Sequence, residues 1–403
     1  MRLPESLRSL RYRDFRAFFA AQVVSQIGTW MHSVAQAWLV LSLTNSPLRL
    51  GFINTLQWGP MLLLAIVSGA IADRVPKRRL LMATQAAMAC TALALATLVA
   101  TGTVAYWHLG ILAVCAGLAN TLDNPARQSF VIEMVGREDV VNAVALNSAA
   151  FNSARIVGPA VGGLVIAHFG VVPAFLVNAA SYVVVLATLA TLGAEGHSRR
   201  QGSTTMRQEI AEGLSYALRT PRIRSVLAVL LVTSFCVFNF SMWVPLLARN
   251  VLGEGAQGFG FLMAAVGFGA VSGALTLGAV VPRHPPLKLL YAASASACAG
   301  LLVLAAVQSF WLAAVALFVV GFTGVVTVAG CNTSLQLSSS DELRGRVMSL
   351  YTLIFGGSFP IAAFLIGAVS ERFSVGTAFF AWGATGLAAL AALLATRRQG
   401  ARG

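Results

Sequence analysis

The chain has 403 residues, of which 57% are hydrophobic and 10% are charged, and its formal net charge is +14. Soluble globular domains carry about 25% charged residues, so this composition excludes a soluble globular protein. Apolar stretches recur along the whole sequence, and many reach the roughly 18 residues that a helix needs to cross a hydrocarbon core. Because the bilayer core offers no water to backbone groups, we expect these stretches to be helical. The composition therefore predicts an all-α polytopic membrane protein.

Taken in chain order, the apolar stretches predict 12 transmembrane helices, six on each side of a polar interval. We expect the first set near 15–43, 48–72, 79–101, 107–131, 141–168 and 172–193. We expect the second set near 223–248, 256–281, 287–308, 310–335, 345–370 and 374–396. The predicted domains are an N-terminal six-helix bundle (1–193), a cytoplasmic linker (194–222), a C-terminal bundle (223–396) and a cytoplasmic tail (397–403). In the linker, Ile210, Leu214 and Leu218 recur among charged residues, which predicts a short amphipathic helix on the membrane surface.

Positive charge gathers on one side of these predicted helices. If the N-terminus is cytoplasmic, every Lys and Arg lies on the cytoplasmic side except Arg49, Arg249 and Arg372, which lie outside, and Arg155, which lies within a helix. The positive-inside rule therefore predicts that both termini are cytoplasmic. The same placement attributes the basic charge to topology and to contact with anionic lipid, and it argues against a nucleic-acid partner.

The five cysteines all lie in apolar stretches, without the spacing of a disulfide framework or a metal site. We interpret them as packing residues and expect neither a metal nor another cofactor.

Two segments in equivalent places of the two halves align without gaps. The segment 69–81 shares its glycine, one alanine, an arginine, a proline and two leucines with the segment 278–290. The match predicts two parallel six-helix repeats, with a site at the midplane between them. A chance match of apolar sequence is the alternative.

The first of these segments, Gly-Ala-Ile-Ala-Asp-Arg-Val-Pro-Lys-Arg-Arg, resembles the signature loop between the second and third helices of the major facilitator superfamily. This resemblance implies a secondary carrier with the major facilitator fold. It also implies a conformational-switch loop formed by Gly69, Asp73, Arg74, Lys77 and Arg78, with Asp73 latched against the second half near Arg346. Pro76 stands where the family pattern has a glycine. Simple anchoring by positive charge is the alternative.

A second motif lies in the fifth predicted helix, where Gly158, Pro159, Gly162 and Gly163 resemble the Gly-Pro-x-x-Gly-Gly pattern of exporters in this superfamily. Proline removes a backbone donor and kinks a helix, and glycines four residues apart let another helix approach closely. The motif favours export over packing alone. The segments 10–16 and 125–128 extend the resemblance to the enterobactin-exporter-like, drug-efflux branch of the superfamily.

Two charged residues fall inside predicted helices. An ionised arginine at the depth of Arg155 costs about 2.5–3.5 kcal/mol, so this residue needs a partner. Asp123, on the preceding helix, is the acidic residue well inside a span, and we predict that it pairs with Arg155. Arg127 competes for Asp123 because it lies four residues further along the same helix. The pair is either a structural salt bridge or one that changes with protonation or substrate.

The first predicted helix carries polar residues at steps of three and four, so one of its faces is polar through much of the bilayer. Such a face lines an aqueous cavity or bonds to a neighbouring helix. His32, beside it, is interpreted as a hydrogen-bonding residue or as a proton carrier. The candidate cavity-lining residues of all helices are Gln22, Gln26, Thr29, His32, Ser33, Gln36, Asn54, Gln57, Asn239, Trp243, Thr323 and Thr327.

Together these features predict a monomeric exporter of the bacterial inner membrane that works by alternating access. We expect it to move a small amphipathic organic molecule, such as a siderophore, drug or metabolite, by proton antiport and in contact with membrane lipid. The alternatives are an ion-coupled importer and a sensor that resembles a transporter but does not transport. An intramembrane enzyme is disfavoured, because the five histidines are scattered and no paired carboxylates lie in the spans.

Overall fold

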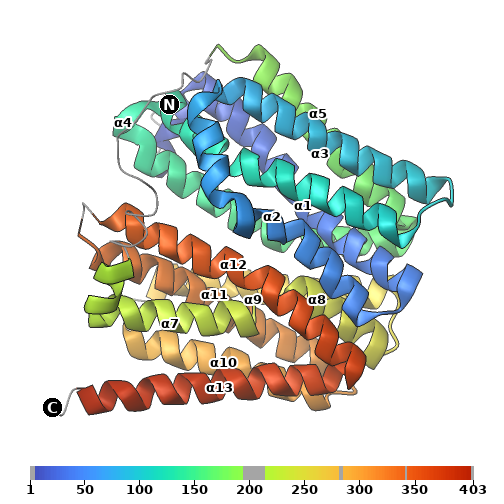
Figure 1. The fold of residues 1–403 in the computed structure, drawn as a ribbon, viewed down its shortest axis with the longest axis vertical. Helices are drawn as coiled ribbons and strands as arrows, with labels where there is room; N and C mark the ends of the chain where they lie inside the picture. The colour runs from blue at the N-terminus through green and yellow to red at the C-terminus, as the bar shows by residue number, and fades with distance from the viewer. Residues whose placement is uncertain (1–4, 194–213, 281–284, 341–342, 401–403) are drawn as a thin grey trace. The chain divides into compact units, whose positions relative to one another are not determined.

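A computed structural model of the chain describes residues 5–193, 214–280, 285–340 and 343–400. All the regular structure in these ranges is helical (Figure 1). Before the linker, the elements are η1 (Glu5–Arg11), α1 (Arg13–Thr44), α2 (Pro47–Arg74), α3 (Lys77–Ala100), α4 (Tyr106–Phe169) and α5 (Val171–Thr191). After it come α7 (Pro221–Cys236), α8 (Phe240–Leu246), the π-helical turn η2 (Leu247–Val251), α9 (Ala256–Val280), α10 (Leu287–Ala306), α11 (Phe310–Ser338), α12 (Arg344–Arg372) and α13 (Val375–Gly400).

The helix ends follow from residues that cannot continue a helix or that start one well. α1 ends just before Asn45, which has a positive φ of 49°, and Gly170, with φ 78°, separates α4 from α5. Glycine and asparagine tolerate this backbone region better than other residues do. α3 begins directly after Pro76, and α7 begins with Pro221. Proline suits a first helical turn because its missing N–H is not needed there.

α4 contains two predicted transmembrane helices joined by a kink. Gly136, with φ 72° and ψ 176°, is the non-helical residue inside it. The predicted spans 107–131 and 141–168 leave residues 132–140 between them, and the structure is helical there on both sides of this one glycine. A single glycine with a positive φ turns the chain without a longer loop.

The seventh predicted helix, 223–248, is not continuous. α7 ends at Cys236 and α8 begins at Phe240, so residues 237–239 interrupt it. Hydropathy does not reveal this break, because Val237 and Phe238 are as apolar as the helices around them.

The chain forms two compact units. The first contains Met1–Thr44 and Gly59–Gly202, and the second contains Asn45–Trp58 and Ser203–Gly403. In the first unit, α1 and α3 both pack on α4 and α5. In the second unit, α11 packs on α7, α9 and α10, and α13 packs on α7 and α10. The boundary between the units therefore falls inside α2, whose first half belongs to the second unit.

The predicted linker lies mostly outside the described residues, so its boundaries stay a prediction. Residues 214–219 are helical. Leu214 and Leu218 are exposed there, which suits a helix on a membrane surface. Ile210, the third member of the predicted apolar face, lies outside the described residues.

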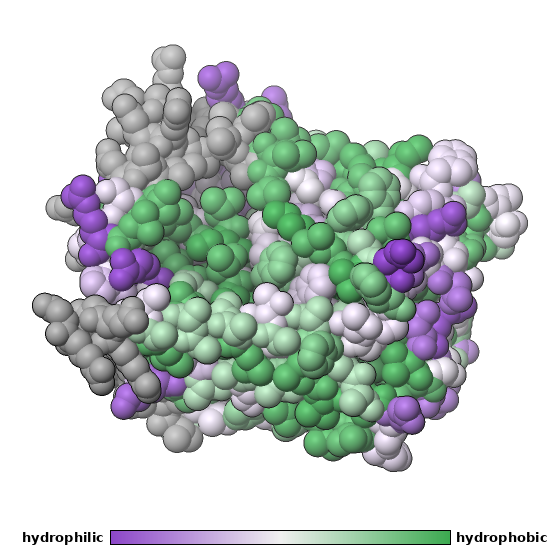
Figure 2. Space-filling view, turned by 60° about the horizontal axis from the view of Figure 1, so that its bottom comes forward, coloured by the Kyte–Doolittle hydropathy of each residue, from purple (hydrophilic) through white to green (hydrophobic). Residues whose placement is uncertain are grey.

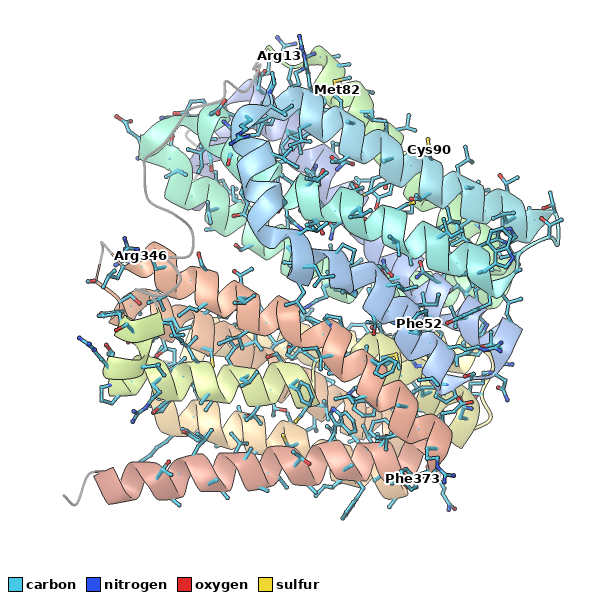
Figure 3. The ribbon with its side chains drawn as sticks, in the orientation of Figure 1. Arg13, Phe52, Met82, Cys90, Arg346 and Phe373 are labelled. Carbon is cyan, nitrogen blue, oxygen red and sulfur yellow. The ribbon has the colours of Figure 1, made fainter. Side chains whose placement is uncertain are left out.

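Within the described ranges, nine helical segments are long and apolar enough to cross a membrane. α1 and α2, with 32 and 28 residues, also have the length that a span requires. The number 12 stays a prediction. Hydrophobic residues make up much of the face that Figure 2 presents. Large apolar side chains such as Phe52 on α2 and Phe373 at the end of α12, both labelled in Figure 3, are 45% and 70% exposed. Exposure of this kind suits a lipid-facing surface.

Candidate functional site

The predicted polar face of α1 bonds to neighbouring helices within the first unit. Arg127 of α4 donates a hydrogen bond to the Gln22 carboxamide oxygen at 3.0 Å. The Thr29 hydroxyl lies 3.0 Å from the hydroxyl of Tyr182 on α5. Ser33 donates to the backbone carbonyl of Thr29 at 3.0 Å. These residues therefore bond within the unit, which is one of the two roles that the sequence allows for them.

Three other candidates on α1 are also largely enclosed. His32 lies edge-on to Phe175, with ring centroids 4.8 Å apart. Gln36 is 6% exposed. The Gln22 amide nitrogen and the Gln26 carboxamide oxygen are buried without a hydrogen-bond partner. The His32 Nδ1 atom is also buried without a partner. Unpaired buried polar atoms are unfavourable, so these three side chains have capacity left for a ligand or a water.

The carboxylate of Asp123 is enclosed within the first unit, with 1% of the residue exposed. Its Oδ1 atom accepts hydrogen bonds from the Thr84 hydroxyl and the Gln85 amide of α3, both at 2.9 Å. Its Oδ2 atom lies 3.6 Å from the Arg127 guanidinium. Arg127 is therefore the observed ion-pair partner of Asp123.

This ion pair replaces the predicted one between Asp123 and Arg155. The i, i+4 spacing survives Pro125, which lies inside the helix between the two residues. Arg155 is half-buried and has interactions of its own. The charged centre of this unit is thus built from α3 and α4 around Asp123.

The exporter-like motif lies where α4 meets α1. A Cβ atom added to Gly158 would stand 2.6 Å from the Trp30 Cβ and 2.7 Å from the Ile27 carbonyl oxygen. At Gly162 it would stand 2.9 Å from the Met31 Cγ. Gly163 and the helix-internal Pro159 are buried. The glycines therefore permit a backbone-to-backbone approach of the two helices, as the small-residue spacing predicts.

The signature loop makes contacts inside the first unit. Lys77 is 6% exposed and pairs with Glu133 of α4. Arg78 donates to the backbone carbonyls of Leu189 and Ala190 at the end of α5, both at 2.7 Å. A cation at this place satisfies the last carbonyls of a helix and its dipole. These two cations thus hold helices together, in addition to any contact with lipid.

The other predicted residues of the signature loop lie in the last turns of α2. Arg74 is exposed. Gly69 and Asp73 lie in the helical part of α2, but their side-chain positions lie outside what the structure describes. The latch between Asp73 and the region of Arg346 therefore stays a prediction.

A cluster at the N-terminus was not predicted from the sequence. Asp139, which is 2% exposed, pairs with Arg8 at 2.6 Å and with Arg11 at 2.8 Å. The hydrogen bond to Tyr12, followed by the charge of Asp139, raises the pKa of Arg11 above its usual value. The Ser9 backbone N–H donates to the Asn142 carboxamide oxygen at 2.9 Å. η1 is thereby fixed to α4 beside the Gly136 kink; the sequence signal would have been the Glu-Asp pair that follows this glycine.

In the second unit, two candidates lie beside the break between α7 and α8. Asn239 and Trp243 are each 1% exposed, and the Asn239 Nδ2 and Trp243 Nε1 atoms have no hydrogen-bond partner. On α11, Thr327 is fully buried and bonds back to the Thr323 carbonyl at 2.8 Å. Thr323 bonds to the Val319 carbonyl at 2.7 Å. The two threonines are therefore satisfied within their own helix.

The first half of α2 packs tightly against α12. A Cβ atom on Gly51 would stand 2.5 Å from the Ala363 carbonyl oxygen, and a Cβ atom on Gly367 would stand 2.6 Å from the Pro47 carbonyl oxygen. Asn54, a predicted candidate, is 9% exposed and accepts a hydrogen bond from Ser241 at 3.3 Å. The other candidate on this helix, Gln57, is half-buried and has partners.

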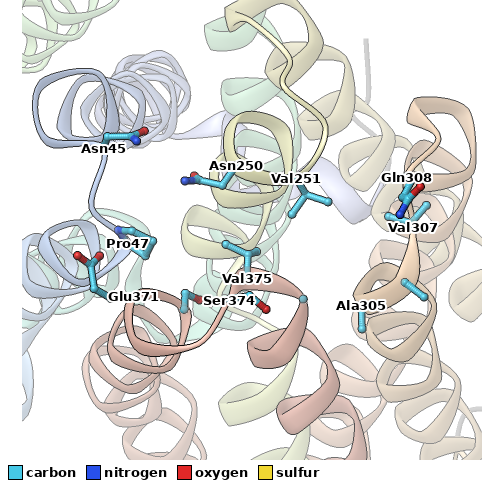
Figure 4. Close-up of a pocket in the computed structure, with 13 residues that line it drawn as sticks. Asn45, Pro47, Asn250, Val251, Ala305, Val307, Gln308, Glu371, Ser374 and Val375 are labelled. Carbon is cyan, nitrogen blue, oxygen red and sulfur yellow. The ribbon is translucent and has the colours of Figure 1, made fainter.

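A cavity of about 740 Å³ opens on the second unit, beside the first turn of α2. In Figure 4, Asn45 and Asn250 point toward one another at its edge. Glu371 accepts hydrogen bonds from the Ser46 hydroxyl at 2.8 Å and the Leu48 N–H at 3.3 Å. The Ser370 hydroxyl, also in the lining, is buried without a partner. The lining is polar, unlike the mostly apolar pockets that bind drug-sized ligands, and the sequence did not single it out.

No group of three or more metal-ligating side chains occurs within the described ranges. Three cysteines are buried, and Cys90 (Figure 3) and Cys115 are exposed on their helices.

Comparison with known proteins relates the chain to membrane carriers. A family model described as "Transmembrane secretion effector" matches residues 5–400. The chain is 23% identical to the staphyloferrin A transporter of Staphylococcus aureus, covering 89% of this chain and 90% of that protein. It is 26% identical to the multidrug efflux pump Tap of Mycolicibacterium fortuitum over 90% of each chain. It is 25% identical to the enterobactin exporter EntS of Escherichia coli over 88% of this chain and 84% of that one.

Solved structures share the fold at low sequence identity. The nucleoside transporter NupG superposes with a TM-score of 0.74 and 11% identity, covering 95% of this chain and 98% of that one. A bacterial homologue of the human lysosomal transporter Spinster gives a TM-score of 0.71 and 13% identity, covering 95% and 94%. The arrangement of helices is therefore that of these transporters.

Proposed function

Since this chain belongs to the transmembrane secretion effector family of the major facilitator superfamily, we propose that it exports an amphipathic organic compound by alternating access, driven by proton antiport. Members of the superfamily are transporters, so the enzyme alternative is set aside. The proposal places the protein in a bacterial inner membrane with both termini in the cytoplasm. It takes its topology from the distribution of positive charge.

One observation carries the direction of transport. Gly158 and Gly162 bring α4 into backbone contact with α1 at Ile27–Met31. This is the place of the Gly-Pro-x-x-Gly-Gly pattern that resembles exporters. The named functions of three relatives, a siderophore transporter, a drug efflux pump and a siderophore exporter, agree with this direction. We infer a cargo of the same general kind, a siderophore, drug or metabolite.

We assign the coupling proton to Asp123. It is buried in the first unit, and a charged group at membrane depth marks a functional site by default. Thr84 and Gln85 donate hydrogen bonds to one of its oxygens, and the Arg127 guanidinium lies 3.6 Å from the other. Protonation removes the attraction to Arg127, whose guanidinium also reaches Gln22 on α1. A proton on Asp123 would thus loosen the connection between α4 and α1.

Transport into inverted vesicles tests this proposal. We expect an exporter to accumulate a labelled aryl siderophore or an anionic dye in the lumen when that lumen is acidic, and we expect a protonophore to abolish the accumulation. Asp123→Asn should remove the proton dependence, with Arg155→Ala as a comparison for a buried charge outside this pair. Accumulation only in right-side-out vesicles would instead favour the importer. A folded protein that moves no probe in either orientation would favour the sensor.

A further inference from the structure

The second unit contains a continuous array of aromatic rings. Tyr351, Phe355 and Phe359 stand four residues apart on one face of α12. The Phe355 centroid lies 6.0 Å from that of Tyr351 and 5.4 Å from that of Phe359. The array continues from Phe359 to Trp58 of α2, with centroids 5.9 Å apart and the rings stacked at 24°.

The same array reaches the break between α7 and α8. Phe238, which lies in the break, is 5.4 Å from Phe355 and 5.4 Å from Phe240, in edge-to-face geometry. Irregular backbone at membrane depth is tolerated only where protein buries it or where it lines a cavity. Interrupted helices of this kind form substrate sites in secondary transporters. The break thus puts two rings of the array at such a place.

The array is only partly covered. Trp58, Phe240, Tyr351, Phe355 and Phe359 are all half-buried. Other rings of the unit, such as Phe259 and Phe379, are fully enclosed. The α12 rings therefore keep accessible surface on a helix that passes through the membrane.

The unsatisfied polar atoms nearest in sequence to this array are all donors. They are Asn239 Nδ2 between Phe238 and Phe240, and Trp243 Nε1 one turn further along α8. A buried donor without a partner is costly, and an acceptor on a ligand would satisfy it. Within the described part of this unit, the acidic residues are Glu254, just before the start of α9, and Glu371, in the last turn of α12. The unpaired donors thus suit a ligand that carries an acceptor.

We propose that this array, together with the Asn239 amide, binds the aromatic ring of a substrate that carries an acceptor oxygen, such as an aryl carboxylate, phenolate or carbonyl. The inference rests on the proposed function and gives it a substrate class. Ring stacking supplies the selectivity for aromatic cargo. The amide donor orients the oxygen toward the helix break.

Equilibrium binding to the purified full-length protein tests the substrate class with three probes. They are 2-naphthoate, its saturated analogue decahydro-2-naphthoate, and 2-naphthylmethylammonium. We expect 2-naphthoate to bind about tenfold more tightly than the saturated acid, because the saturated rings cannot stack on the array. A factor of ten in affinity corresponds to about 1.4 kcal/mol. We expect the ammonium to bind more weakly still. Equal affinity for the two carboxylates would overturn the proposal.

Variants separate the two parts of the site. Phe355→Leu and Phe359→Leu should each lower the preference for the aryl over the saturated carboxylate by several-fold. Phe364 lies on the same helix outside the array and is 41% exposed, so Phe364→Leu should leave this preference unchanged. Asn239→Ala should weaken both carboxylates equally and leave their ratio intact. A ratio that is unchanged in both array variants, in protein that stays monodisperse, would assign the rings to packing alone.

The binding assay is independent of transport. Export from vesicles by a protein that binds both carboxylates equally would overturn the aromatic site and leave the proposed function standing. Selective binding of the aryl carboxylate by a protein that transports nothing would overturn the proposed function and leave the aromatic site standing.

Discussion

Replacing Gly158 with alanine places a methyl group where α4 touches α1. The new carbon would lie 2.6 Å from the Trp30 Cβ and 2.7 Å from the Ile27 carbonyl oxygen, and 3.3 Å from the Met31 nitrogen. Optimal separations between such atoms are about 3.5–4.0 Å. Two of the three neighbours are backbone atoms, so no side-chain rotation relieves the clash. The two helices must move apart by about 1 Å.

Forcing extra carbon into a close-packed site destabilises a protein by about 1–3 kcal/mol. Gly158→Ala should fall in the upper half of this range, because the neighbours are rigid. Gly162→Ala should fall in the lower half. Its nearest neighbour, at 2.9 Å, is the flexible Met31 side chain. The order of the two variants therefore tests the geometry more sharply than either value does.

Reversible unfolding of the purified protein in SDS, followed by tryptophan fluorescence, measures both free energies of unfolding. Gly59→Ala is the control, because a Cβ atom there meets nothing within 4 Å and the residue lies inside α2. Alanine is favoured over glycine in a helix by about 1 kcal/mol, so this control should be neutral or slightly stabilising. If Gly158→Ala unfolds like Gly59→Ala, the close contact of α4 with α1 is refuted.

Three further substitutions address other contacts. Asp123→Ala should destabilise the protein by about 1–3 kcal/mol in the same unfolding assay, because the buried Thr84 hydroxyl and Gln85 amide lose their acceptor; Asp123→Asn, which keeps an acceptor oxygen, should cost less. Arg78→Ala should cost about 1.5–3 kcal/mol through the lost hydrogen bonds to the end of α5, and Arg79→Ala serves as its exposed neighbour. Gly51→Ala should push the first half of α2 away from the Ala363 carbonyl, and faster labelling of a cysteine introduced at Ala363 by a membrane-impermeant maleimide would report this.

Much of the fold follows from apolar length, because a membrane leaves a stretch of 20 apolar residues little choice but a helix. The kink at Gly136 and the break at residues 237–239 do not follow from it. Both depend on backbone geometry in segments whose hydropathy resembles that of their neighbours. Asn239 was predicted as a cavity residue from its polarity, but polarity alone does not show that the helix stops there.

The ion pairs were harder to predict than the helices. Lys77 pairs with Glu133 across 56 residues, and Arg8 pairs with Asp139 across 131. Periodicity reports only neighbours on one helix, so it found Arg127 as a competitor for Asp123 but gave no reason to prefer it. The preference comes from α3, since Thr84 and Gln85 hold the other carboxylate oxygen and fix the orientation of Asp123.

The first helices of the two units differ, although the aligned segments 69–81 and 278–290 predict equivalent repeats. α1 is one continuous helix of 32 residues, and two of its polar side chains, Gln22 and Thr29, bond to α4 and α5. Its counterpart is divided into α7, α8 and a π-helical turn, with buried donors left unpaired at the division. A continuous helix transmits a movement along its length, whereas an interruption with unpaired donors is able to gain a ligand. We therefore propose that coupling belongs to the first unit and recognition to the second. Asn239→Ala should weaken the binding of both carboxylates and leave the proton dependence in place, while Asp123 variants should change the proton dependence and leave the cargo preference in place.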